Sequence, residues 1–146
     1  MKLLIQRVNK ASIRINDWWV QTMHSWIVVY VWFTHEDSSA QLQKAAERIV
    51  MLPFFEDETG KIKHSLSTHQ WSLLLVPNFT LYGRNKKWNQ LDYTHAAPFQ
   101  EAESLFKQLC TYIQTIYPHP ILIWEFWAYM EITATNTWPV NIFIDI

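Results

Sequence analysis

Apolar and polar positions alternate along the first part of the chain in the manner of half-buried β-strands. The segment LLIQRV (residues 3–8) has this strand character, and in SIRIN the side chains of Ile13 and Ile15 share one face while Arg14 lies on the other. The segment NDWWVQT predicts a hairpin whose turn, Asp17-Trp18, is ordinarily Asp-Gly. The nearly continuous apolar run WIVVYVWF (residues 26–33) predicts a central strand that is covered on both faces.

Two later segments have the period of amphipathic helices. The first can be capped by Asp37, Ser38 or Ser39, and the second begins near Pro98, a residue that suits the first helical position. Each segment carries one apolar stripe, which predicts packing against the sheet. The stripes consist of Leu42, Ala45, Ala46, Ile49 and Val50, and of Phe99, Ala102, Leu105, Phe106, Leu109, Tyr112, Ile113 and Ile116.

The remaining apolar segments read as strands. SLLLVPNFTLY (residues 72–82) predicts a buried strand that bulges or ends at Pro77, because proline cannot donate a hydrogen bond to a ladder. The chain closes with three strand-like segments, ILIW, AYMEITATN and VNIFIDI. We therefore expect a single domain, residues 1–146, of the α+β class, with two main helices on a largely antiparallel or mixed sheet.

Charge and cysteine content narrow the function. The net charge is -1 and 17% of the residues are charged, so no broad basic face is expected and any nucleic acid would be held locally. Arg84, Lys86 and Lys87 form a local basic cluster, which is either a solvated loop or a phosphate contact. The single Cys110 is expected to be a buried helical residue, as suits a reducing cytoplasm. No apolar run reaches 18 residues, so no membrane span is predicted.

Candidate chemistry is concentrated in VPNFTLY. The six histidines form no HExxH motif and no ligand pairing with cysteine, and no phosphate-binding glycine loop is present, so neither a metal nor a cofactor is predicted. At the break in the strand, however, the Thr80 hydroxyl and the Asn78 amide lie beside backbone that Pro77 releases from the ladder. Free backbone N–H groups can stabilise an oxyanion, which favours acyl-transfer chemistry at this break.

Several motifs in order make the chain resemble one family. IQRV, FTHED, FFEDETGK, FTLY, AAP, FWAYM and the terminal N-x-x-P-V are similar, over essentially the whole chain, to those of the D-aminoacyl-tRNA deacylases of the D-Tyr-tRNA deacylase type. The resemblance implies the fold of that family and hydrolysis of the ester bond of D-aminoacyl-tRNA, and also of glycine mischarged onto alanine tRNA. It implies a quality-control step in translation that needs no cofactor.

The resemblance also implies a homodimer that binds the 3′ end of aminoacyl-tRNA. A Gly-Pro step of one subunit enters the site of its partner, where its carbonyl groups bind the amino group of the D-aminoacyl moiety, and the ribose 2′-OH of the substrate assists the hydrolysis. Trp138 and Pro139 match this step, and Arg7 matches the arginine that holds it. The implied catalytic residues are Asn78, Phe79 and Thr80, and the implied substrate-binding residues are Pro77, Trp138, Pro139, Arg7, Phe126 and Met130.

Two departures from the family pattern keep alternatives open. Pro77-Asn78 replaces a usual Ser-Gln, and together with Thr135-Asn136 this resembles a related deacylase that acts on L-alanyl-tRNA or glycyl-tRNA. Trp138 replaces the glycine of the Gly-Pro step, so the chain is alternatively a non-catalytic dimer that binds tRNA ends with its pocket blocked. The isomer of the Trp138–Pro139 bond is open at this stage, since X-Pro bonds adopt both forms.

Tryptophan is abundant where glycine is scarce. The chain has two glycines and nine tryptophans, and seven of the tryptophans match glycine positions of the family. Without compensation, seven such sites would cost about 7–20 kcal/mol through strained backbone and overpacking. We therefore hypothesise that they are alterations of ancestral glycines, which an intact mass of the protein tests. The seven are Trp26, Trp32, Trp71, Trp88, Trp124, Trp127 and Trp138.

Overall fold

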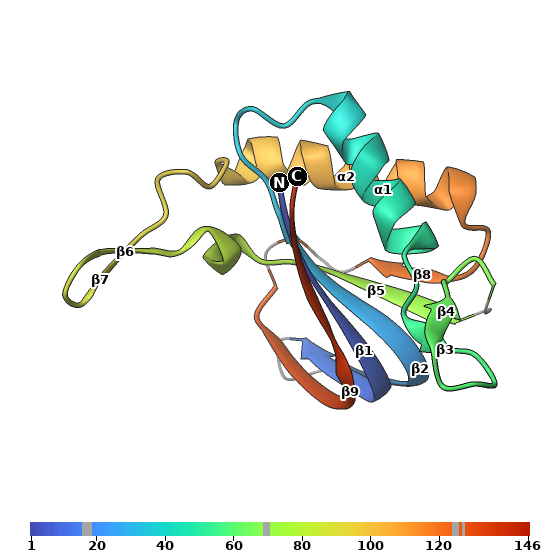
Figure 1. Ribbon diagram of the computed structural model, residues 1–146. Coiled ribbons are helices and arrows are strands. Elements are labelled where there is room, and N and C mark those ends of the chain that lie inside the picture. The colour runs from blue at the N-terminus through green and yellow to red at the C-terminus, as the bar shows by residue number, and fades with distance from the viewer. Residues whose placement is uncertain (16–18, 69–70, 124–125, 127) are drawn as a thin grey trace.

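A five-stranded sheet in the order β8-β5-β2-β1-β9 is the centre of the computed structural model (Figure 1). The structure describes residues 1–15, 19–68, 71–123, 126 and 128–146, and the predicted Asp17-Trp18 turn lies outside them. Two small sheets, β3-β4 and β6-β7, accompany the central one. The strands are β1 (Lys2–Ile15), β2 (Trp19–Trp32), β3 (Phe55–Glu56), β4 (Ile62–His64), β5 (Ser72–Pro77), β6 (Arg84–Lys87), β7 (Gln90–Asp92), β8 (Ile121–Ile123) and β9 (Met130–Asp145).

The sheet is mixed, as predicted. β1 pairs antiparallel with both β2 and β9, whereas β5 runs parallel to β2 and to β8. β2 lies in the middle of the five strands, and its apolar run is buried from Ile27 to Val29 and again from Val31 to Phe33. The prediction of a central strand at residues 26–33 is therefore confirmed, and so is the α+β fold class.

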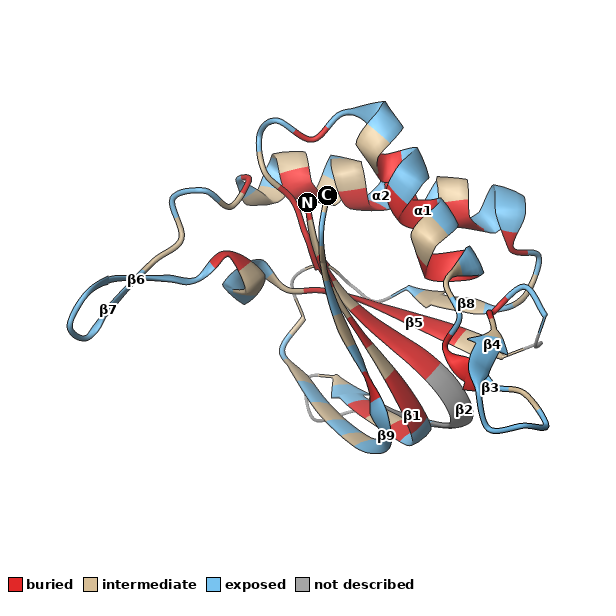
Figure 2. Cartoon of the chain, in the orientation of Figure 1, coloured by how far each residue is buried: buried red, intermediate tan, exposed pale blue. Residues whose placement is uncertain are grey.

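Both helices pack on the same face of the sheet. α1 (Ser39–Met51) follows Ser38, whose backbone N–H donates to the Gln41 side chain, and α2 (Phe99–Ile116) follows Pro98. The buried residues of the two helices cluster with alternate residues of the central strands, while intervening residues such as Val28 and Leu74 form a second cluster. Figure 2 shows buried positions along the strands and on the sides of the helices that face them.

The buried strand predicted to bulge or end at Pro77 does end there, and one other strand prediction needs correction. Beyond β5, Phe79–Tyr82 forms a 3₁₀ helix, η1. Loss of the proline N–H and the capping side chain of Asn78 favour this helix over a continued ladder. The last two predicted strands belong to one strand, β9, whose pairing with β1 is interrupted by a bulge around Pro139.

The thiol of Cys110 is buried. The residue lies in α2, and burial raises the pKa of its thiol to about 12. The thiolate is the form that attacks disulfide reagents, so at pH 8 almost no reactive species is present in the folded protein. We expect Ellman's reagent to leave Cys110 unmodified in the native protein and to titrate one equivalent after unfolding in guanidinium; rapid native-state reaction would contradict the buried placement.

The tryptophans that the structure describes are accommodated in different ways. Trp32 is buried and its indole N–H donates to the Ala97 carbonyl at 3.3 Å. Trp71 is half-buried against the ring of Phe55, with 4.1 Å between the ring centroids. Trp88 and Trp138 are exposed. The side chains of Trp18 and Trp26, together with Trp124 and Trp127, lie outside the described part of the chain.

Across the described residues, no helix is long and apolar enough to cross a membrane.

Candidate active site

The first half of the candidate site begins where β5 ends. Pro77 is the last residue of β5 and pairs with Val31 of β2. The Asn78 N–H still donates to the Val31 carbonyl at 2.9 Å, after which the chain turns into η1. The first residues of VPNFTLY are therefore fixed to the central strand β2, and the residues that follow Asn78 are exposed.

The Asn78 side chain organises the next two residues. Its Oδ1 accepts from the Thr80 N–H at 3.1 Å and from the Thr80 hydroxyl at 2.5 Å. The Thr80 N–H is thus bound within the motif and is not one of the backbone donors that the break in the strand leaves free. The Phe79 N–H stands at the first position of η1, where the helix itself supplies no acceptor. The arrangement presents one backbone donor and one oriented hydroxyl at the end of β5.

An aromatic cluster forms the wall behind these groups. The Phe79 ring, 38% exposed, makes edge contacts with Trp32 and Phe99 at centroid distances of 6.0 and 5.9 Å. Phe126 stacks on Trp32 at 5.3 Å, which brings this predicted substrate-binding residue to the same cluster as Phe79. The cluster supplies an apolar surface beside the polar Asn78–Thr80 pair.

The second half of the candidate site is centred on Arg7. This buried side chain donates through Nη1 to the Phe54 carbonyl at 2.8 Å, and through Nη2 to Glu56 Oε1 at 3.2 Å and to the Trp138 carbonyl at 3.4 Å. Arginine can make several such bonds at once because its five donors are fixed in one plane. The contact with Trp138 agrees with the role that the resemblance implies for Arg7.

The Trp138–Pro139 step stands out from the sheet. Gln6 pairs with Asn141 and Val8 with Asn136, so residues 137–140 of β9 lie opposite Arg7 alone and form a bulge. The peptide between Trp138 and Pro139 is cis. The Trp138 side chain is 83% exposed, whereas Val140 is buried and anchors the end of the bulge. A cavity of about 320 Å³ lies beside it, lined by Arg7, Phe55, Glu56, Trp71 and Thr137.

Sequence reasoning did not identify two partners of Arg7. The Phe54 carbonyl and the Glu56 carboxylate both belong to the FFEDETGK segment, which entered the sequence-based predictions only as a motif of the resemblance. The buried Phe54 was the available signal, because an apolar pair at the start of a polar loop indicates an anchored backbone. Through the hydrogen bonds of Arg7, this segment is connected to the Trp138–Pro139 step.

The two halves do not meet within one chain. Pro77 lies in the row of Val31 and Leu3, whereas Arg7 is four residues further along β1, about 13 Å away, and two strands across, about 10 Å. Met130 is further still, because it pairs with Ile15 at the far end of β1. The structure therefore brings Asn78, Phe79, Thr80 and Phe126 together in one place and Arg7, Trp138 and Pro139 in another.

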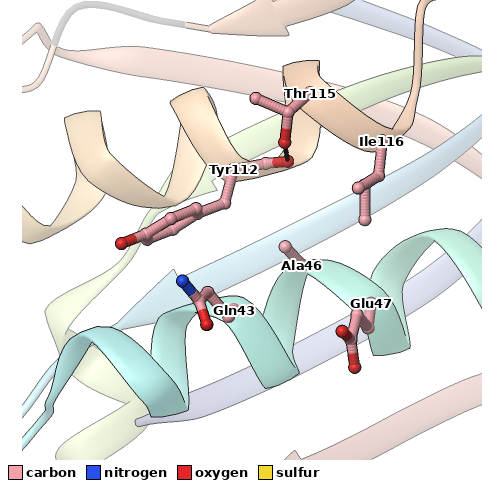
Figure 3. Close-up of a pocket in the computed structure, with 6 residues that line it drawn as sticks. All are labelled: Gln43, Ala46, Glu47, Tyr112, Thr115 and Ile116. Atoms are coloured by element: carbon pink, nitrogen blue, oxygen red, sulfur yellow. Dashed lines mark hydrogen bonds between the residues drawn. The ribbon is translucent and has the colours of Figure 1, made fainter.

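A separate cavity of about 210 Å³ lies between the two helices (Figure 3). None of the predicted site residues lines it. Its walls are Gln43, Ala46, Glu47, Tyr112, Thr115 and Ile116, and the Thr115 hydroxyl donates back to the Tyr112 carbonyl of its own helix. Among the described residues, no group of three or more histidine, cysteine, aspartate or glutamate side chains could hold a metal ion.

Comparison with known proteins identifies the family of the chain. The family model described as D-Tyr-tRNA(Tyr) deacylase matches residues 4–145. A D-aminoacyl-tRNA deacylase of Bacillus pumilus (strain SAFR-032) is 32% identical over 145 residues, covering 99% of this chain and 98% of the relative. One from Dichelobacter nodosus (strain VCS1703A) is 33% identical over 143 residues, with 98% of each chain covered.

Two solved structures have the same fold. A protein described as c-Myc DNA Unwinding Element Binding Protein superposes with a TM-score of 0.91 at 30% identity, covering 100% of this chain and 99% of that one. A probable eukaryotic D-amino acid tRNA deacylase gives 0.86 at 11% identity, covering 99% and 98%, and supports the fold alone. With a family match across nearly the whole length and relatives of about one-third identity, this chain belongs to the D-Tyr-tRNA deacylase family.

Proposed function

We propose that the protein is a hydrolase that cleaves the ester bond of D-aminoacyl-tRNA in the cytoplasm. The family match and the names of the relatives support this activity over an L-alanyl-tRNA or glycyl-tRNA deacylase and over a non-catalytic dimer. The observation that carries the proposal is the pairing of Asn78 with Thr80, which orients an exposed hydroxyl next to the Phe79 N–H at the end of a buried strand.

The same proposal includes a homodimer with shared sites. In a twofold-symmetric dimer the same surface of each subunit contacts the other subunit. The Trp138–Pro139 step of each chain can therefore enter the Asn78–Thr80 site of the other. The separation of Arg7 and the Trp138–Pro139 bulge from Asn78–Thr80 within one chain supports this arrangement, as does the exposure of Trp138. Two complete sites per dimer follow.

Each group then has a defined role in the reaction. The Phe79 N–H donates to the ester carbonyl oxygen, where negative charge develops as water attacks the carbonyl carbon. The bond between that carbon and the ribose oxygen breaks, giving a free amino acid and uncharged tRNA. The carbonyl groups of the partner's Trp138–Pro139 step bind the substrate ammonium, and Arg7 fixes their position. The Thr80 hydroxyl donates to Asn78, so its oxygen accepts a hydrogen bond from the attacking water, and Asn78 holds it in that orientation. Pro77 and Phe126 shape the aminoacyl pocket.

Release of free amino acid from three substrates tests the activity. We expect the protein to accelerate hydrolysis of D-Tyr-tRNA above the spontaneous rate and to leave L-Tyr-tRNA at that rate, while Gly-tRNA shows whether the small glycyl group is also accepted. Protection of D-Tyr-tRNA from spontaneous loss would instead identify a binding module. Preference for an L-aminoacyl or glycyl ester over D-Tyr-tRNA would favour the related deacylase that Pro77-Asn78 resembles.

A further inference from the structure

The β6–β7 hairpin extends away from the body of the protein (Figure 1). Its two strands pair with each other and belong to no larger sheet. All four residues of β6 are exposed, and so are the tip residues and most of β7 (Figure 2). A two-stranded ribbon without a buried face gains little stability from its own chain. Its conformation is therefore available to be fixed by a binding partner.

The positive charge on this hairpin is neutralised only in part. Arg84 pairs with Asp92 across the two strands at 2.8 Å. Within the described residues, Lys86 and Lys87 have no ion-pair partner, whereas Lys63 and Lys107 are each bound by a carboxylate of their own element or loop. Two adjacent free ammonium groups therefore lie at the end of an exposed ribbon, in a chain whose net charge is only -1.

The tip adds an exposed aromatic ring. Trp88 follows Lys87 directly, and its side chain is 97% exposed. Proteins that hold single-stranded nucleic acid combine cationic groups, which bind phosphates, with exposed rings on which bases stack. Protein interfaces, in contrast, are depleted in lysine at their centres; β6 has no apolar side chain, and Leu91 is the one exposed apolar residue of β7. The chemistry of the hairpin favours RNA over a second protein surface.

The hairpin is also in reach of the substrate. It follows η1 through Gly83 alone, and Lys87 is seven residues from Thr80. Seven residues of extended chain span at most about 25 Å. Residues 80–82 belong to η1, so about 25 Å is an upper limit for this stretch. A stacked nucleic-acid strand rises about 3.4 Å per nucleotide, so the arm reaches up to about seven nucleotides from the ester. Those nucleotides comprise the unpaired 3′ end and the beginning of the acceptor stem.

We propose that Lys86 and Lys87 bind phosphate groups of the acceptor strand of the tRNA, so that the hairpin is an RNA-binding arm beside the active site. The location of the site at Asn78–Thr80 rests on the proposed function. The inference that the hairpin binds RNA rests on its charges and exposure. The contacts are to phosphates and carry no base specificity. The arm accordingly serves any aminoacyl-tRNA equally.

Binding of uncharged tRNA to the full-length protein tests the arm without requiring turnover. We expect the double variant Lys86→Gln/Lys87→Gln to bind roughly tenfold more weakly near physiological salt, because two phosphate contacts are lost. The slope of log affinity against log salt concentration should become shallower by about one for each lysine. Fluorescence anisotropy across a salt series measures both quantities.

The control variant Lys44→Gln/Lys107→Gln changes the net charge equally, on the exposed surfaces of α1 and α2. It should leave affinity and salt slope close to those of the unaltered protein. An equal loss in both double variants, or none in the arm variant, would overturn the proposal. Dissociation of the arm variant into monomers, seen by light scattering, would overturn it too and assign the hairpin to a subunit interface. If the unaltered protein binds tRNA through the arm yet hydrolyses no ester, the proposed function fails and the arm stands.

Discussion

Replacing Trp138 by glycine is expected to raise kcat/KM for D-Tyr-tRNA by about 10- to 100-fold. The indole is exposed on the step that, in the proposed dimer, enters the partner's pocket beside Phe79. Forcing excess volume into a packed site costs about 1–3 kcal/mol, and each 1.4 kcal/mol corresponds to about tenfold in rate. Removal of the indole removes this cost, so the free energy of substrate binding becomes more favourable by the same amount. Rates of tyrosine release from the unaltered protein and the variant measure the effect.

Two further variants separate the volume of the indole from the freedom of glycine. Trp138→Ala removes the ring and keeps a Cβ atom, so it should recover most of the gain. Thr137→Gly adds backbone freedom to the same exposed bulge without removing a ring, and it should give no gain. Activity that is equal in the unaltered protein and in Trp138→Gly would show that the indole does not enter the site.

Replacing Arg7 by methionine is expected to lower the free energy of unfolding by about 2–3 kcal/mol and to reduce turnover of D-Tyr-tRNA at least 100-fold. The change keeps an apolar stem of similar length but removes the donors to the buried Phe54 carbonyl and to the Trp138 carbonyl. A hydrogen bond from a charged group contributes about 1.5–3 kcal/mol, and a buried acceptor left unpaired adds to the loss. Chemical denaturation measures the stability, and tyrosine release measures the activity.

Arg14→Met is the matched control for this variant. Arg14 lies on the same strand and pairs with Glu131 at 3.4 Å, but both side chains are about half exposed. Surface ion pairs of this kind contribute about 0–1 kcal/mol. Loss of stability at Arg7 that is no greater than at Arg14 would contradict the central position assigned to the Arg7 hydrogen bonds.

The hydrophobic pattern predicted most of the fold because burial repeats with the period of each element. The five apolar residues of the α1 stripe are all buried, and α2 begins directly after Pro98 as its sequence indicates. The apolar run at residues 26–33 lies in the middle of the sheet for the same reason. Periodicity alone did not distinguish the 3₁₀ helix at FTLY from a strand, since that choice depends on the Asn78 cap.

The candidate site was predicted in part. The resemblance named Asn78, Thr80 and Arg7, and the structure shows the hydrogen bonds that hold each of them. It did not predict that the Thr80 amide is occupied by Asn78, because a sequence does not show which donor a short side chain selects. The Phe54 carbonyl also escaped prediction, since the apolar pair at the start of its segment indicates an anchored backbone but not which side chain that carbonyl accepts from. The contacts between segments that are distant in the sequence could be identified only from the structure.

The central claim, that each active site combines Asn78–Thr80 of one subunit with the Arg7-held step of the other, is tested most directly by complementation. Chains carrying Thr80→Val and chains carrying Arg7→Met are co-expressed with different tags, and the heterodimer is purified. One of its two sites then combines unaltered residues from both subunits. We expect each homodimer to be inactive and the heterodimer to hydrolyse D-Tyr-tRNA at about half the unaltered rate. A heterodimer as inactive as either homodimer would contradict the shared site.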